Sequence, residues 1–119
     1  MINELLSVRW EQIGQQIVVH VAGEVDLTTA PLLVQALREA AAAPQARWVA
    51  VDLTEVKFFG AIGLTTLLTA SRRGEVTGVP IVVVSRPGQP SHRTITMGQL
   101  QGELTVIDTL GHGCSAIAP

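Results

Sequence analysis

Hydrophobic and β-branched residues near the start of the chain predict two strands. Residues 4–10 and residues 16–22 both favour an extended backbone, and the second segment contains the run Ile-Val-Val at 17–19. Residues 11–15, which include Gly14, have the composition of a turn. We therefore expect an antiparallel hairpin at the beginning of the fold.

A helical period follows this hairpin. Apolar residues recur at the spacing of one helix face over residues 30–40, and Thr28 and Thr29 are candidate capping residues. Pro31 stands in the first turn, where proline is tolerated. Pro44 ends the helix, because the residue before a proline disfavours the helical conformation.

The hydrophobic pattern then predicts further strands and helices. The nearly continuous apolar run at 48–53 suits a strand that is covered on both faces, as in a parallel or mixed sheet. Strands that alternate with helices after a hairpin indicate an α/β fold, in which helices pack on one mixed sheet. The remaining expected segments are a turn at 54–55, an extended stretch at 56–59, a second helix that begins within 60–63, a strand at 80–84, a loop at 87–90, a weakly patterned helix at 91–100 and a last strand at 104–107.

Length and composition fit one globular domain. A chain of 119 residues can build one core but not two, and we expect the domain at 1–110 and a loose tail at 111–119. The hydrophobic fraction is 47% and the charged fraction is 15%, values that favour a packed core over disorder.

Charge and hydropathy argue against several classes of protein. The formal net charge is -2 and basic residues adjoin only at Arg72 and Arg73, so we expect no nucleic-acid binding. No apolar stretch reaches the roughly 18 residues that a membrane helix requires, so we expect no membrane insertion. Residues 1–10 lack a signal-peptide pattern, and the single cysteine, Cys114, cannot form an internal disulfide. We therefore expect a cytoplasmic location.

The sequence contains no strong catalytic or metal-binding motif. The histidines His20, His92 and His112 are far apart, and His112 with Cys114 offers too few ligands for zinc, which needs several. No phosphate-binding glycine loop and no serine nucleophile elbow is present. We expect a protein that is not an enzyme and that needs no metal or cofactor.

Two clusters remain as candidate binding features. The first, residues 23–30, places Glu24 and Asp26 at a strand-to-helix turn, where acids either serve the turn and the helix dipole or face a partner. The second, residues 58–64, carries two glycines at a helix start. These glycines allow either tight helix packing or close approach of a partner or an anion to the backbone.

The same two clusters carry a resemblance to a known family. Residues 19–31 read Val-x-x-x-Gly-Glu-Val-Asp-x-x-Thr-Ala-Pro, and residues 51–59 read Val-Asp-Leu-Thr-x-Val-x-Phe-Phe, followed by Gly63-Leu64. These motifs resemble those of STAS domains, over about residues 5–107 of the chain. The resemblance implies a STAS-like α/β fold. For the bacterial anti-sigma factor antagonists in that family, it implies a signalling protein that binds an anti-sigma factor, often a serine-protein kinase, and so frees a sigma factor for transcription.

The chain departs from this resemblance at the site of the regulatory switch. In the antagonists, the kinase phosphorylates a serine within Asp-Ser-Ser-Gly-Leu at the start of the second helix. Residues 60–64 here read Gly-Ala-Ile-Gly-Leu, so the position of that serine is Ala61, which cannot take a phosphate and its charge of roughly -1.5 to -2. Thr65 and Thr66, one turn further along, are candidate substitute phosphosites.

Three binding roles remain open from the sequence. The first is an antagonist-like module that engages an anti-sigma factor without control at residue 61. The second is a STAS subunit of a lipid-transport ATPase complex, in which the same helix face docks on the ATPase. The third is a sensor that holds a nucleotide phosphate at the amides of residues 60–63. The protein is expected to be a monomer or a weak homodimer, and its expected partner-binding residues are Glu24, Asp26, Thr28, Gly60, Ala61, Ile62, Thr65 and Thr66.

Overall fold

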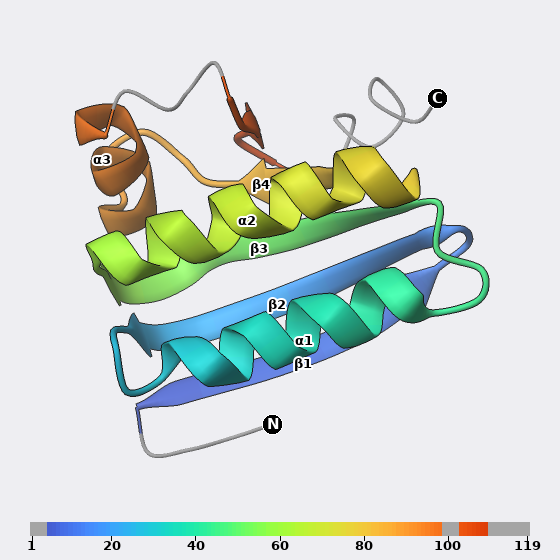
Figure 1. Ribbon diagram of the computed structural model, residues 1–119. Coiled ribbons are helices and arrows are strands. Elements are labelled where there is room, and N and C mark those ends of the chain that lie inside the picture. Colours follow the sequence, from blue (N-terminus) through green and yellow to red (C-terminus); the bar gives the residue numbers. More distant parts are fainter. Residues whose placement is uncertain (1–4, 99–102, 110–119) are drawn as a thin grey trace.

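The computed structural model describes residues 5–98 and 103–109 and confirms an α/β fold with one mixed sheet. The sheet has five strands in the order β1-β2-β3-β4-β5, and α1 and α2 lie side by side on one face of it (Figure 1). The expected tail at 111–119, with His112 and Cys114, lies outside the described residues, as does the end of the helix expected at 91–100. The elements are β1 (Leu6–Ile13), β2 (Gln16–Val25), α1 (Ala30–Ala42), β3 (Trp48–Phe59), α2 (Ala61–Thr77), β4 (Ile81–Val84), α3 (Pro90–Met97) and β5 (Thr105–Ile107).

β1 and β2 form the expected antiparallel hairpin, but its turn is shorter than the sequence indicated. The pairing continues to Ile13 opposite Gln16, so a two-residue turn joins the strands. Gly14 in this turn has a φ of 63°, a conformation that glycine adopts without strain. The turn expected at 11–15 was wrong because residues 11–13 belong to an exposed edge strand, where no buried face imposes an alternating pattern.

The helices cover one face of the sheet and bury the main hydrophobic core there. β2 to β5 are parallel, and a helix connects each strand to the next. The core combines aliphatic side chains from the strands and from all three helices, with Phe59 among them. Because side chains alternate across a strand, a smaller buried cluster of Val18, Trp48, Ala50 and Val82 belongs to the opposite face.

β3 is one continuous strand, and the turn expected at 54–55 is instead an irregularity within it. His20 of β2 pairs with Asp52 of β3, whereas Ala22, two residues further along β2, pairs with Glu55, which is three residues further along β3. β3 therefore contains one extra residue at this point. The Asp52 carboxylate accepts hydrogen bonds from the Thr54 amide at 3.0 Å and from the Thr54 hydroxyl at 2.7 Å. The prediction of a turn was wrong because pairing with β2 continues past these residues and turns the irregularity into a bulge.

A second shift of register brings the ends of β2 and β3 together. Gly23 pairs with Val56, but the next residue, Glu24, pairs with Phe58. β2 continues through this shift to Val25, beyond its expected end. The first shift turns Val56 to the core, and the second restores the original alternation, so Phe59 faces the core where the strand ends.

Gly23 allows the start of β1 to approach β2 closely. Its φ is 107°, and a Cβ placed on it would lie 2.1 Å from the carbonyl oxygen of Leu5. That carbonyl accepts a hydrogen bond of 2.8 Å from the Glu24 amide. A side chain at residue 23 would therefore strain the backbone and also separate the two strands.

We predict that Gly23→Ala lowers the free energy of unfolding by about 2 to 4 kcal/mol, because a clash with a backbone oxygen adds to the strain of the left-handed backbone. Gly78→Ala is the matched control. Gly78 has a φ of 83° but open space for a Cβ, so its variant should lose only about 1 kcal/mol. Urea unfolding gives both values, and equal losses would contradict the steric argument.

Candidate functional site

The connections that follow β2 and β3 meet at one end of the sheet. The carboxyl ends of neighbouring parallel strands lie at the same edge, where loops commonly form binding sites. The Gly60 amide donates a hydrogen bond of 3.0 Å to the carbonyl oxygen of Val25 and so joins the two connections directly. In Figure 1 this end is the left-hand one, where α1 and α2 both begin and where α3 lies.

Asp26 builds the turn between β2 and α1. Its Oδ1 accepts hydrogen bonds from the amides of Thr28 (2.9 Å) and Thr29 (3.0 Å), while its carbonyl oxygen accepts one from the Ala30 amide at 2.8 Å. Thr29 is the residue before α1, but its hydroxyl does not cap the helix. The hydroxyl instead donates to the carbonyl oxygen of Glu24 at 2.8 Å, so the expected threonine cap was wrong and Asp26 organises the turn.

Two glycines shape the start of α2. Gly60 is the N-cap residue and offers no side-chain cap. A Cβ on Gly63 would lie 2.7 Å from the ring of Phe59, so a glycine there lets the helix lie directly on that buried ring. Phe58, the residue directly before Phe59, points away from the core and is 52% exposed.

A shallow depression of about 680 Å³ lies between the two connections. Leu27 and Phe58 expose large apolar surfaces there, with Leu27 79% exposed. Six of the eight sequence-predicted residues line it, together with these two apolar residues. The lining of this end depression is Asp26, Leu27, Thr28, Phe58, Gly60, Ala61, Ile62 and Thr65.

The other two predicted residues lie elsewhere. Glu24 is partly exposed on β2, where it pairs with Phe58 next to the depression. Thr66 is only 7% exposed and faces α1, and its hydroxyl donates to the carbonyl oxygen of Ile62 at 2.8 Å. Thr65 is exposed, and its hydroxyl donates to the carbonyl oxygen of Ala61 at 3.3 Å.

Sequence reasoning placed Leu27 and Phe58 inside the two candidate clusters but did not choose them as binding residues. Phe58 and Phe59 are equally hydrophobic, but Phe59 continues the alternation of the buried residues Val49 and Val51, so that alternation was the signal that separates the two rings. The signal in the structure is the exposure of two large apolar side chains beside polar turn residues.

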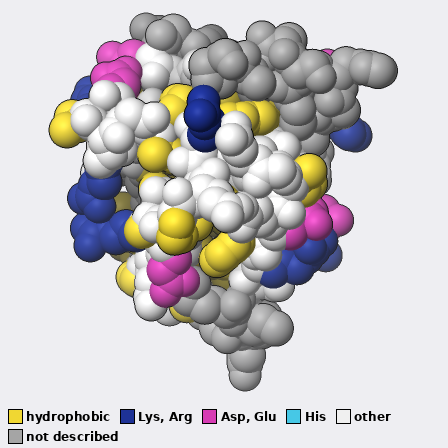
Figure 2. Space-filling model, turned by 90° about the vertical axis from the view of Figure 1, so that its right-hand side faces the viewer, with side chains coloured by type: hydrophobic (Ala, Val, Ile, Leu, Met, Phe, Trp, Pro, Cys, Tyr) yellow, Lys and Arg dark blue, Asp and Glu magenta, His cyan; other side chains and the backbone are white. Residues whose placement is uncertain are grey.

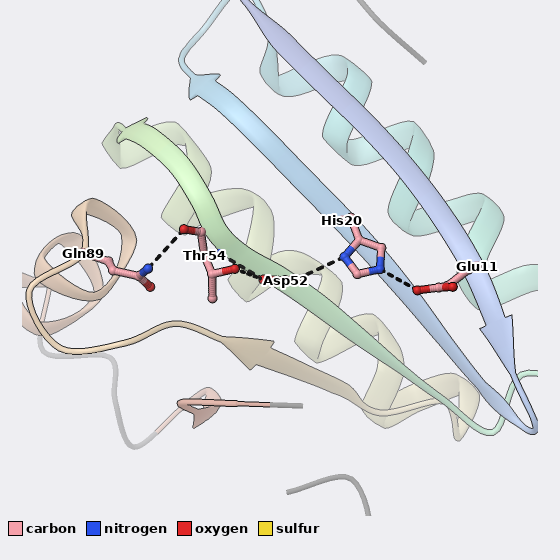
Figure 3. A network of polar contacts seen from close by, with 5 residues as sticks. All are labelled: Glu11, His20, Asp52, Thr54 and Gln89. Atoms are coloured by element: carbon pink, nitrogen blue, oxygen red, sulfur yellow. Dashed lines mark hydrogen bonds and ion pairs between the residues drawn. The ribbon is translucent and has the colours of Figure 1, made fainter. Parts of the chain in front are cut away.

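A second group of polar side chains crosses the sheet away from the depression (Figure 3). His20 on β2 lies between two carboxylates, with its Nε2 2.8 Å from Glu11 on β1 and its Nδ1 3.1 Å from Asp52 on β3. Gln89, before α3, donates from Nε2 to the carbonyl oxygen of Thr54 at 3.1 Å. Every member has a partner within the protein, so this network braces three strands and the first bulge of β3.

Asp52 is the best-connected carboxylate of the network. Burial raises its pKa, but the hydrogen bonds from the Thr54 hydroxyl and amide and the contact with His20 together outweigh burial, so the pKa lies below its ordinary value of 3.8. The ionised carboxylate therefore stabilises the fold above the unfolded pKa. This contribution is lost as the pH falls through the lower pKa of the folded protein.

We predict that Asp52→Asn lowers the free energy of unfolding by about 1 to 3 kcal/mol at pH 7, because charge-assisted hydrogen bonds are lost. The difference from the wild type should shrink as the pH falls below about 4. Chemical denaturation across this range is the measurement. Glu55→Gln, at an exposed position of the same strand, should change stability by less than about 0.5 kcal/mol. A difference that stays constant in acid would contradict the ionised state.

The described residues offer little for other kinds of site. Within residues 5–98 and 103–109, no group of three or more His, Cys, Asp or Glu side chains could hold a metal ion. In the same part of the chain, no helix is long and apolar enough to cross a membrane. Figure 2 shows the end of the molecule opposite the depression, where basic and acidic side chains are interspersed and form no broad patch of one sign.

Comparisons with known proteins agree with this architecture. A family model described as "Mlab, STAS domain" matches residues 8–107. An anti-sigma factor antagonist from Mycobacterium paratuberculosis is similar in structure, with 28% sequence identity, a TM-score of 0.79, and 94% of this chain and 93% of that chain covered. The anti-sigma factor antagonist SpoIIAA is similar in its unphosphorylated form, with 12% identity, a TM-score of 0.73 and coverage of 95% and 100%. In its phosphorylated form SpoIIAA, a Bacillus cell fate determinant, gives 12% identity, a TM-score of 0.68 and coverage of 94% and 100%. Because the family model spans most of the chain, this protein belongs to the STAS-domain family.

Proposed function

We propose that this protein is a binding module that engages an anti-sigma factor and thereby regulates transcription, and that it is not an enzyme. The proposal is supported by the similarity to the mycobacterial antagonist, which extends over nearly all of both chains. One observation supports the proposed binding surface: the end depression brings residues of both candidate clusters together around two exposed apolar side chains.

The chemistry of the end depression suits a protein partner. Exposed Leu27 and Phe58 would seat an apolar side chain of the partner, as central apolar contacts do in many interfaces. Glu24 and Asp26 place negative charge at one side, which would attract basic groups. Within the described residues, only Oδ1 of the Asp26 carboxylate has hydrogen-bonding partners, so Oδ2 remains for a partner.

Binding at this surface would not be switched off by phosphorylation at residue 61. Ala61 is exposed at the rim of the depression, but it has no hydroxyl to accept a phosphate. Of the two substitute phosphosites, Thr65 is the better placed, because it is exposed and lines the depression while Thr66 is buried against α1. We therefore propose a partner complex that persists in the presence of ATP.

A second candidate function is a STAS subunit of a lipid-transport ATPase complex. The observation that favours it is Ala61, since a subunit that docks permanently needs no phosphate switch. The same end depression would then contact the ATPase. The two candidates differ in the identity of the partner rather than in the surface.

We predict that the double variant Leu27→Ser/Phe58→Ser binds the partner at least about tenfold more weakly, because both apolar contacts are lost. Tagged wild-type protein would first be used to capture its partner from lysate of the source cells, with identification by mass spectrometry. Calorimetric titration of the purified partner would then give the affinities. Recovery of an anti-sigma factor supports the first function, and recovery of a transport ATPase supports the second.

The matched control for this experiment is Val76→Ser. Val76 is 87% exposed on α2 but lies outside the depression, so the substitution removes a similar apolar surface elsewhere. It should leave the affinity unchanged. Equal binding by the wild type and the double variant would refute the surface, whichever partner is recovered.

We predict that Ala61→Glu binds the partner about tenfold more weakly than Ala61→Gln does, because a partner side chain seated on Leu27 and Phe58 would remove the new carboxylate from water without a paired charge. The two side chains have similar size, so their difference isolates the charge. The substitution should not unfold the protein, since a negative charge at a helix N-terminus is favourable. Calorimetric titration measures both affinities, and equal affinities would show that charge at residue 61 does not control binding.

A further inference from the structure

A groove runs between α1 and α2 on the helical face of the sheet, away from the centre of the end depression. It encloses about 230 Å³. Leu37 of α1 and Ile81 of β4 provide an apolar floor, and both are nearly fully buried. The two helices lie side by side at this position (Figure 1).

The groove exists because α2 presents short side chains to α1. Thr66 and Ala70, one turn apart on α2, line the groove where a longer side chain would fill it. Thr66 uses its hydroxyl hydrogen within its own helix, where it donates to the carbonyl oxygen of Ile62. The interior wall of the groove is therefore largely apolar, although two threonines contribute to it.

Two arginines stand at the groove, one from each helix. Arg38 on α1 and Arg73 on α2 both line it, and both are exposed. Within residues 5–98 and 103–109, neither guanidinium forms an ion pair, and no acidic side chain lines the groove. The hydroxyl of Thr69, on the same side of α2, also has no hydrogen-bonding partner among these residues.

We propose that this groove binds a small amphiphilic anion, namely an aliphatic carboxylate with about eight carbon atoms in all. An engineered apolar cavity of about 150 Å³ holds benzene, so a groove of 230 Å³ accommodates about nine non-hydrogen atoms. The aliphatic chain lies on the floor formed by Leu37 and Ile81. The carboxylate lies between Arg38 and Arg73, whose planar guanidinium groups match its two oxygens.

The size and the charge of the groove exclude other classes of occupant. A partner helix is about 10 Å across and needs a much wider groove. A simple inorganic anion would make no contact with the apolar floor, and a neutral apolar molecule would make no ion pair with either arginine. An amphiphilic carboxylate satisfies both parts of the site at once.

The test uses octanoate as the probe, with two compounds that each carry half of its chemistry. Titration of the full chain with octanoate, followed by ¹H–¹⁵N NMR spectra, should give saturable shifts at the amides of the groove residues, with a dissociation constant on the order of 1 mM or tighter. Acetate has the carboxylate alone and 1-octanol has the chain alone. Each should bind at least about tenfold more weakly than octanoate.

Two arginine variants test whether the groove recognises the carboxylate of octanoate. Arg38→Gln/Arg73→Gln should weaken octanoate binding at least about tenfold, because exposed arginines are replaced without loss of packing. Arg72→Gln is the matched control. Arg72 neighbours Arg73 in sequence but lies outside the groove, 4.0 Å from Glu103, so its variant should bind octanoate like the wild type. Unchanged binding by the double variant, equal binding of 1-octanol, or no saturable shift up to about 10 mM octanoate would each overturn the proposal.

Discussion

The hydrogen bond between the Gly60 amide and the Val25 carbonyl holds together the end of the molecule that carries the depression. Beyond Val25 and Phe59 the ladder between β2 and β3 stops, and the remaining backbone carbonyls need other partners. The Thr29 hydroxyl binds the carbonyl of Glu24, and the Thr94 hydroxyl of α3 binds the carbonyl of Phe59 at 2.7 Å. Three different connections are therefore fixed to the end of the same two strands, which is why exposed loop residues there can keep a defined surface.

The alternation of side chains along β3 leaves one phenylalanine ring at this surface. The strand has two extra residues opposite β2, which together leave the alternation unchanged, so Phe59 faces the core and Phe58 faces away from it. Gly63 completes the arrangement, because it allows α2 to lie on the buried ring while the other ring stays at the depression. The network of Figure 3 braces the first bulge through Asp52.

The sequence predicted the hairpin, the order of the elements and the mixed sheet, because periodicity and turn residues act locally. It failed at residues 54–55, where the local hydrogen bonds of Asp52 indicate a turn but pairing with β2 keeps the strand continuous through a bulge. Thr66 is buried because α1 packs over it, and a contact between two helices leaves no mark in the pattern of one of them. Features that depend on neighbouring residues in the sequence could therefore be predicted, whereas features that depend on strand register or on packing between helices could not.

The two proposals meet at Thr65, which lines both the end depression and the interhelical groove. A protein whose residue 61 carries no hydroxyl has no phosphate switch at that position, so its affinity for a partner must be controlled elsewhere if it is controlled at all. A ligand changes partner affinity only when it binds the free and the partnered forms unequally. A carboxylate held by Arg38 and Arg73 lies on the same face of α2 as Thr65, next to the surface that the partner would cover. By offsetting part of the positive charge of these arginines, it would change the electrostatic potential at that surface within about one Debye length. The groove is therefore placed where a bound anion could alter the affinity of the neighbouring surface for a partner.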